Sequence, residues 1–384
     1  MAKIIFAVLF LFVFIYYPSG ACPYCTSPGA CVHDHWKQLS YGKVKVTGET
    51  GRRIDLTIQN HLKKLDLQNV FLNQFRTKEA KDGFIGTGML LEAAVRFAAY
   101  SPDPEIAAIK NQIVDCLLEN QQADGYIGFF AEEQRLWQAW DIHEMAYIII
   151  GLVSDYTLFG QKRSLDAAVK TADYIINRWN PPAGFTDFFY TGIDNAILSL
   201  YKATGEERFR EFGENKRPLL TWAPGIEKGR TPRMFGHIFA YMAMNEAQLN
   251  IYRMTADKRF TEANSSAMDF LTAHDGLSII GGAGQEECWT DDQDGEGDHA
   301  ETCATSYLIR IYDHLLRLHG QSSYGDLMER SIYNALFAAQ SPDGRRIRYY
   351  IPFEGERKYL QKDDYCCPNN FRRIISELPL MIYY

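Results

Sequence analysis

The sequence lacks any strongly basic stretch. Its 384 residues include 40 Lys or Arg and 48 Asp or Glu, which gives a formal net charge of −8. Proteins that bind nucleic acid gather basic side chains on one face or in one run. Nothing of that kind occurs here, so we do not expect nucleic acid as a partner.

The sequence also lacks a second long apolar run. After the N-terminus we find no stretch long and apolar enough to cross a bilayer. The N-terminus has a lysine, the apolar run Ile4–Tyr17 and small residues at Ser19 and Ala21, which is typical of a secretory signal. A membrane anchor and a lipoprotein cysteine at Cys22 are the alternatives. We expect residues 1–21 to be removed and the protein to be secreted, to the extracellular space or a periplasm, without a stable membrane span.

Runs of alternating polar and apolar residues are scarce, and no low-complexity linker divides residues 44–384. Instead, apolar residues recur at steps of three and four, as in 104–121, 144–160 and 304–320, and many such segments end at Gly. We expect helices throughout, with one short strand in "KVKVTGETG" (43–51). With 46% apolar residues, the chain can bury a large core.

Two segments repeat one pattern: "LSLYKATGEERFREFG" (198–213) and "LNIYRMTADKRFTEAN" (249–264). Each combines a helix carrying an aromatic residue with a short turn and a second helix. Recurrent helical hairpins over this length predict a toroid of alternating inner and outer helices, with a solenoid as the alternative.

The cysteines fall into two groups. Cys22, Cys25 and Cys31 lie among small residues in the segment 22–43, and in an oxidising compartment they predict one local disulfide with a thiol left over. Their CxxC spacing also suits a metal, but no second pair of ligands lies nearby. Cys116 is typical of a buried helical thiol.

The second group lies in the last quarter of the chain. A polar loop leads into a helix that we expect to start near Ala304, with Glu301 and Cys303 at its entrance, and "DDYCCPNN" carries Cys366 and Cys367. Because adjacent cysteines pack poorly in a core, we expect that pair in an irregular segment. Three thiolates and one carboxylate form an ordinary tetrahedral zinc site. A disulfide or inert thiols remain open from the residues alone.

Several motifs resemble those of glycoside hydrolase family 127, the β-L-arabinofuranosidases. These are "AETCATSYLIRI", "MERSIYNALFAAQSPDG" and "YCCPNNFRR", with weaker matches in "QQADGYIG" and "FGHIFAYMA". The resemblance covers 44–384 and implies an all-α (α/α)6 barrel with a carbohydrate substrate. The family usually continues from this barrel into C-terminal β-sandwich modules, and we expect these modules to be absent here.

The resemblance also implies site residues. Glu301, Cys303, Cys366 and Cys367 would bind zinc, Cys366 would be the nucleophile, and Glu287 would be the acid/base, with Glu286 as the alternative. The residues that resemble sugar-contacting positions are Tyr126, His143, His237 and Tyr349. A histidine expected before the helix of the first repeat is replaced by Tyr190, and His143 either substitutes for it or is a buried structural residue.

The resulting expectation is a secreted retaining glycosidase that releases non-reducing-end β-L-arabinofuranose or a related sugar through a zinc-bound cysteine. The alternative is a catalytically inactive, zinc-stapled sugar-binding or scaffold protein of the same fold. A lyase or an unsaturated glycuronyl hydrolase of similar architecture would not need the paired thiols.

Overall fold

The computed structural model describes residues 31–79, 84–228 and 235–384. Within these ranges the regular structure is helical, and β-pairing is limited to isolated bridges. The prediction of an all-helical protein is therefore confirmed. The predicted signal peptide (1–21), Cys22 and Cys25 lie outside the described residues, and Cys31 is disulfide-bonded.

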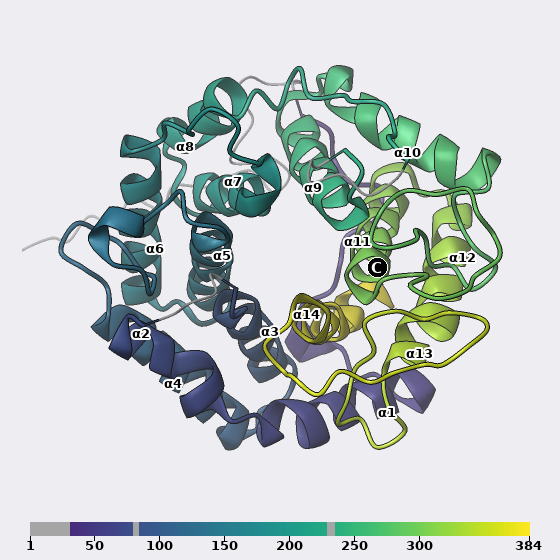
Figure 1. Cartoon of the computed structure of the whole chain (residues 1–384), viewed down its shortest axis with the longest axis horizontal. Helices are drawn as coiled ribbons and strands as arrows, with labels where there is room; N and C mark the ends of the chain where they lie inside the picture. Colours follow the sequence, from purple (N-terminus) through teal and green to yellow (C-terminus); the bar gives the residue numbers. More distant parts are fainter. Residues whose placement is uncertain (1–30, 80–83, 229–234) are drawn as a thin grey trace, which may run out of the picture.

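The helices form a closed toroid (Figure 1). The inner ring consists of α3 (Thr87–Tyr100), α5 (Asp141–Phe159), α7 (Ile193–Thr204), α9 (Ile238–Thr255), α11 (Thr302–His319) and α14 (Cys366–Met381). Each inner helix contacts the next, and α14 returns to contact α3. This closure distinguishes the toroid from a solenoid.

Outer helices surround this ring. They are α1 (Gly48–Leu56), α2 (Asn73–Thr77), α4 (Pro104–Glu119), α6 (Lys162–Asn177), α8 (Glu207–Glu211), α10 (Glu262–Ala273), α12 (Ser322–Arg330) and α13 (Phe337–Ala339). The sequence repeat is visible here, because 198–213 ends α7 and forms α8, and 249–264 ends α9 and begins α10. Each repeat is thus an inner helix followed by an outer one.

The inner helix α5 is buried on nearly every side. By length and composition alone it could cross a membrane, so the expectation that no later stretch is apolar enough was wrong. Most of the helix is buried inside the molecule, as in the core helix of a toroid, where neighbours cover the whole circumference.

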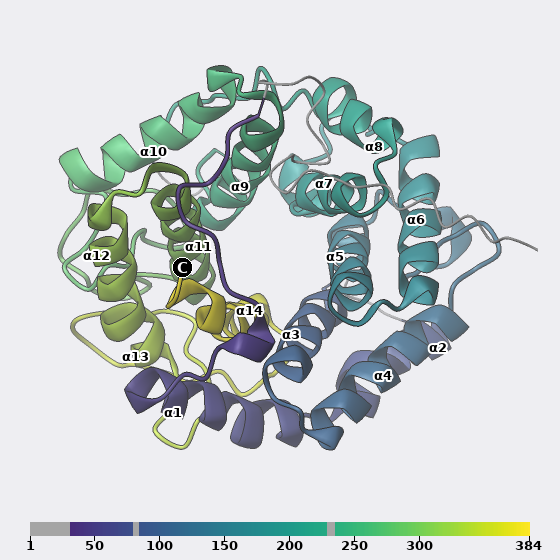
Figure 2. The same ribbon diagram turned by 180° about the vertical axis from the view of Figure 1, so that it is seen from behind.

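The prediction of a short strand in residues 43–51 is also wrong. Val44 has extended backbone angles, but α1 begins at Gly48, and the N–H of Val46 donates to the Tyr100 hydroxyl (3.1 Å). Extended residues without a partner strand form no sheet. The segment before them crosses one end of the ring (Figure 2), where Asp34 pairs with Arg253 (2.7 Å).

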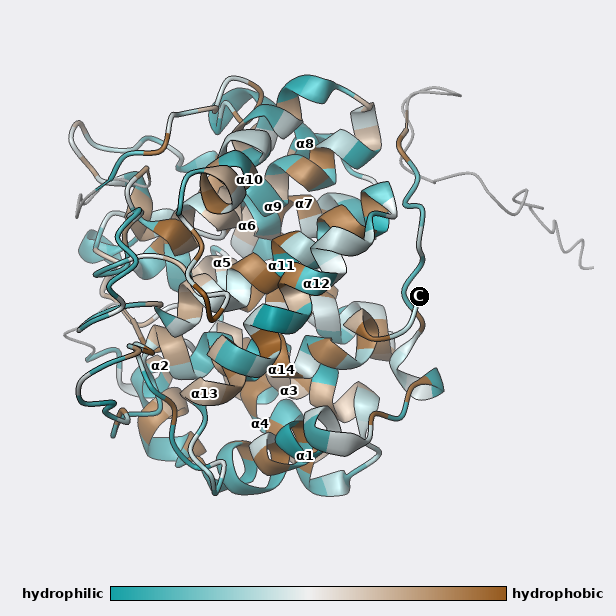
Figure 3. Ribbon diagram, turned by 90° about the vertical axis from the view of Figure 1, so that its right-hand side faces the viewer, coloured by the Kyte–Doolittle hydropathy of each residue, from teal (hydrophilic) through white to brown (hydrophobic). Residues whose placement is uncertain are grey.

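The two ends of the toroid differ. The long connections between outer and inner helices gather at one end, and the N-terminal segment lies at the other (Figure 3). All inner helices start at the end with the long connections, because an outer helix returns the chain between each pair. This end carries the candidate site.

Gly88 allows α3 and α5 to approach closely. A Cβ atom there would lie 2.2 Å from the backbone nitrogen of Ile148. Gly88→Ala should therefore lower the free energy of unfolding by about 1–3 kcal/mol through overpacking. Gly325→Ala in α12 is the matched control, since its nearest new contact is 3.8 Å away and Ala favours a helix by roughly 0.5–1 kcal/mol. Urea unfolding measures both, and equal effects would contradict the packing argument.

Candidate active site

A cavity of about 240 Å³ lies where the inner helices begin. Its lining is Phe84, Trp140, His143, Phe188, His237, Phe239, Glu287, Glu301, Tyr349, Lys362, Asp364, Tyr365 and Cys366. Most of these residues lie just before or in the first turn of an inner helix. The unpaired N–H groups and positive dipole ends of these helices therefore point toward the cavity and favour negative charge within it.

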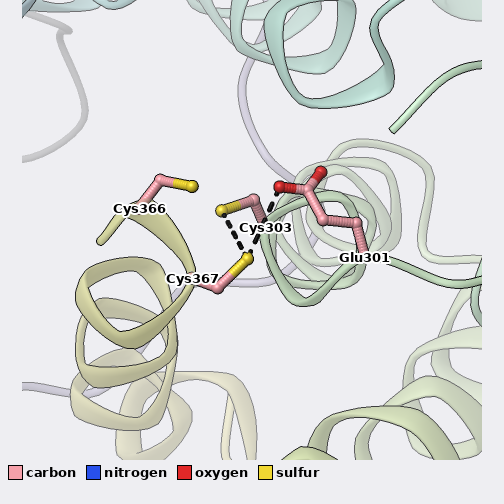
Figure 4. A group of neighbouring side chains, drawn as sticks. All are labelled: Glu301, Cys303, Cys366 and Cys367. Carbon is pink, nitrogen blue, oxygen red and sulfur yellow. Dashed lines mark hydrogen bonds between the residues drawn. The ribbon is translucent and has the colours of Figure 1, made fainter. Parts of the chain in front are cut away.

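Four potential metal ligands point toward one another (Figure 4), and two of them, Glu301 and Cys366, line this cavity. The ligand atoms of Glu301, Cys303, Cys366 and Cys367 all lie within 4.8 Å of one another. The Cys303 and Cys367 sulfurs are 3.3 Å apart, and the Cys367 thiol donates to Glu301 Oε1 (3.5 Å). The structure thus brings together the four residues that the sequence analysis grouped.

Two helix starts create this convergence. Glu301 is the N-cap residue of α11, which begins at Thr302, close to the expected start near Ala304. Cys366 and Cys367 are the first residues of α14, so the prediction that they lie in an irregular segment is wrong. Pro368 fits that first turn, because the N–H it lacks would have no partner inside the helix.

The charges in this cluster are unevenly distributed. Burial raises the pKa of Glu301 and of the Cys303 and Cys367 thiols well above their usual ranges. Hydrogen bonds from Cys303 and Cys367 instead hold the pKa of Cys366 well below its usual range. Among the three thiols, Cys366 is therefore the one that most favours the thiolate.

The donor set fits a zinc ion. Glu301 Oε2 is buried and has no hydrogen-bond partner in the described part of the chain. A buried carboxylate oxygen without a partner is costly unless a cation satisfies it. Three sulfurs and one oxygen in a closed cluster are ligands that zinc accepts in tetrahedral geometry.

Tyr349 connects Glu287 to this cluster. Its hydroxyl donates to Glu287 Oε1 and lies 3.5 Å from the Cys366 sulfur. His237 Nδ1 accepts from the Ala240 N–H (3.4 Å), which leaves Nε2 to carry a proton toward Glu287 Oε2, 3.3 Å away. Glu286 is exposed and does not line the cavity, so of the two candidates Glu287 is the one that lines the cavity together with Cys366.

The backbone around the cavity is strained. Trp140, Glu286, Glu287 and Ala300 all have positive φ angles, between 48° and 71°. Each such residue costs on the order of 1–3 kcal/mol, and such residues persist where the surrounding structure fixes them, often at functional sites. Two of these four residues are Glu287 itself and Ala300, the residue before Glu301.

Of the other residues predicted to contact sugar, one lines the cavity and one does not. His143 lines the cavity, and neither of its ring nitrogens has a hydrogen-bond partner among the described residues. Burial lowers the pKa of His143 to about 3, so the ring is neutral. Tyr126 does not reach the cavity, because it is fully buried and its hydroxyl donates to Asp141 (2.9 Å). Tyr190 is also buried outside the lining.

The cavity also has an aromatic wall that was not predicted from the sequence, formed by Phe84, Trp140, Phe188 and Phe239. The Trp140 ring packs edge-on against Phe84 and Phe188, with centroids 5.8 and 4.8 Å apart. The available signal was an aromatic residue within a few positions of the start of successive inner helices. These four rings make part of the cavity lining apolar, whereas Glu287, Glu301 and Cys366 make another part polar.

Relatives of known structure share this fold. A family 127 β-arabinofuranosidase aligns with 22% identity and a TM-score of 0.73, covering 90% of this chain and 62% of that one. A β-L-arabinofuranosidase of the same family from Geobacillus stearothermophilus T6 aligns with 20% identity and a TM-score of 0.72, covering 88% of this chain and 65% of that one. A cellobiose 2-epimerase from Spirochaeta thermophila has a TM-score of 0.57 at 14% identity, with 86% and 96% covered.

Relatives found by sequence identify the family more specifically than the shared fold does. A non-reducing-end β-L-arabinofuranosidase from Bifidobacterium longum subsp. longum is 24% identical over 360 residues, covering 76% of this chain and 54% of the relative. The chain thus spans about half the length of this curated relative. The sequence model of the β-L-arabinofuranosidase GH127 catalytic domain matches residues 52–380. Since that match takes in nearly the whole toroid and all four clustered ligands, the chain belongs to glycoside hydrolase family 127.

Proposed function

We propose that this protein is a retaining glycosidase that releases non-reducing-end β-L-arabinofuranose, or a closely related sugar, after export from the cell. The observation that carries the proposal is the contact of one hydroxyl, that of Tyr349, with both Glu287 and Cys366 inside the cavity. Retaining hydrolysis needs a nucleophile and an acid/base group on opposite sides of the anomeric carbon, about 5–5.5 Å apart in carboxylate enzymes. A shared tyrosine hydroxyl is compatible with that separation.

In the first step, Glu287 donates a proton to the glycosidic oxygen while the Cys366 sulfur attacks the anomeric carbon. The C–S bond forms as the C–O bond breaks, and the leaving group departs as an alcohol. In the second step, Glu287 removes a proton from water, whose oxygen displaces the sulfur and frees the sugar. Cys366 returns to the thiolate and Glu287 to the acid.

Glu301, Cys303, Cys366 and Cys367 would hold the zinc ion. Bound there, zinc would keep the coordinated thiols deprotonated and offset the negative charge of the cluster. Tyr349 and His237 orient Glu287, and the neutral ring of His143 can donate to and accept from sugar hydroxyls.

The two catalytic roles can be separated by substitution. Cys366→Ser should abolish turnover, because a hydroxyl is a different nucleophile and a poorer leaving group. Glu287→Gln should lower kcat roughly 10²–10⁴-fold with alkyl leaving groups, and less with an activated aryl glycoside that needs little acid help. Glu286→Gln is the matched control and should keep wild-type rates. If Glu286→Gln loses activity instead, the acid/base assignment moves by one residue.

Metal content tests the cluster independently of activity. Elemental analysis of the purified protein should give about one zinc per chain, as expected for one closed four-ligand site. Cys303→Ser and Cys367→Ser should lose most of this zinc and unfold at a lower temperature, because a ligand bound only by the folded state stabilises it. Cys116→Ser, a buried thiol outside the cluster, should retain the metal. Retention of zinc by Cys303→Ser would contradict the assigned ligand set.

A further inference from the structure

A second cavity, the axial cavity, lies inside the ring, away from the candidate active site. Its volume is about 620 Å³, and all six inner helices contribute to its lining. Asp34 and Tyr41, from the N-terminal segment that crosses one end of the ring (Figure 2), also line it. The axial cavity therefore reaches the end of the toroid opposite the long connections, and no step of the proposed hydrolysis uses it.

The arginines of this lining are compensated by carboxylates of the chain. They are Arg96, Arg253, Arg317 and Arg373. Arg253 and Arg317 both pair with Asp34 (2.7 and 2.5 Å). Arg96 and Arg373 both pair with Glu92 (both 2.5 Å). The positive charge of each arginine thus has a negative partner within the protein.

Lys202 on α7 differs from these arginines. It lines the axial cavity, and its ammonium donates to Asn250 Oδ1 (2.7 Å), but in the described part of the chain it forms no ion pair with a carboxylate. Burial lowers the pKa of Lys202 to about 8. A desolvated charge without a counter-ion is costly. Lys202 therefore carries a positive charge that the described residues around the cavity leave uncompensated.

The remaining ionisable groups of the lining do not supply the missing charge. Glu246 lies beyond ion-pair distance of Lys202, and burial raises the pKa of Glu246, which favours its neutral form. His314 Nδ1 lies 3.0 Å from the Arg253 guanidinium, which can only donate, so the ring proton is on Nε2, 3.8 Å from Glu246. Burial lowers the pKa of His314 well below its usual range, so this ring is neutral.

We propose that the axial cavity binds a small organic anion with one carboxylate group, and that Lys202 is its counter-ion. One uncompensated positive charge matches a monocarboxylate, whereas a dianion would bring an excess of negative charge. Asn250 accepts from Lys202 through Oδ1, so its Nδ2 is free to donate to the same carboxylate. Ile150 and Val153 belong to the same lining and can cover a short hydrocarbon part.

Calorimetric titration with sodium propionate at neutral pH and constant ionic strength tests this site. The wild type should bind propionate saturably and more tightly than sulfate. Lys202→Met keeps the apolar stem and should weaken binding roughly 10- to 100-fold, because it removes a hydrogen bond from a charged donor. Lys162→Met, at a lysine whose side chain is 77% exposed on α6, is the control and should keep the wild-type affinity.

This titration needs no turnover, so its outcome is independent of the proposed glycosidase function. Because Lys202 lies outside the candidate active site, a loss of binding in Lys202→Met locates propionate in the axial cavity. The absence of saturable binding to the wild type, equal affinity in Lys202→Met, or tighter binding of sulfate than of propionate overturns the proposal.

Stability without propionate separates an uncompensated charge from a structural one. Lys202→Met should then be at least as stable as the wild type in urea unfolding, because it removes a desolvated charge that has no counter-ion. Lys110→Met is the matched control, since Lys110 is buried and pairs with Asp155 (2.6 Å), and its loss should lower the urea midpoint by leaving that carboxylate uncompensated. If Lys202→Met loses as much stability as Lys110→Met, the Lys202 ammonium is already compensated within the protein, and the proposal is overturned.

Discussion

The site depends on two helices, α11 and α14, that begin side by side at the same end of the ring. Their contact places Glu301 and Cys303 against Cys366 and Cys367, although more than sixty positions separate the two pairs in the sequence. Both helix starts direct N–H groups and positive dipole ends toward the cluster, which lowers the cost of gathering anionic ligands there. A shift of either helix along its axis would move one pair of ligands away from the other.

A network of buried ion pairs below the cavity resists such a shift. Arg310 on α11 forms two hydrogen bonds with Glu377 on α14 (both 2.7 Å), and Arg373 on α14 pairs with Glu92 on α3 (2.5 Å). Arg96 on α3 contacts both Glu92 and Glu377. Removing one partner of a buried pair leaves an uncompensated charge, which is strongly destabilising. The network therefore fixes α3, α11 and α14 in register where the ring closes.

The sequence alone was sufficient to predict those features that depend on a local pattern of residues. Apolar periodicity predicted the helices. The residues alone offered a zinc site at Glu301, Cys303 and the adjacent cysteines as one of several possibilities, and the family resemblance implied it as one ligand set. The sequence was insufficient for the aromatic wall, because Phe84 and Phe188 come from separate segments that only ring closure brings together. Tyr126 shows the opposite error, since its loop resembles a sugar-site loop but its hydroxyl is committed to Asp141.

The buried cluster also couples metal binding to protonation. Burial raises the pKa values of Glu301, Cys303 and Cys367, which favours the protonated forms of these three groups. Coordination requires the deprotonated forms, so uptake of a divalent cation must release protons, and its affinity must rise with pH. Cys366 is the exception, because its neighbours already favour the thiolate. The residue assigned as nucleophile is thus the one whose charge depends least on the ion.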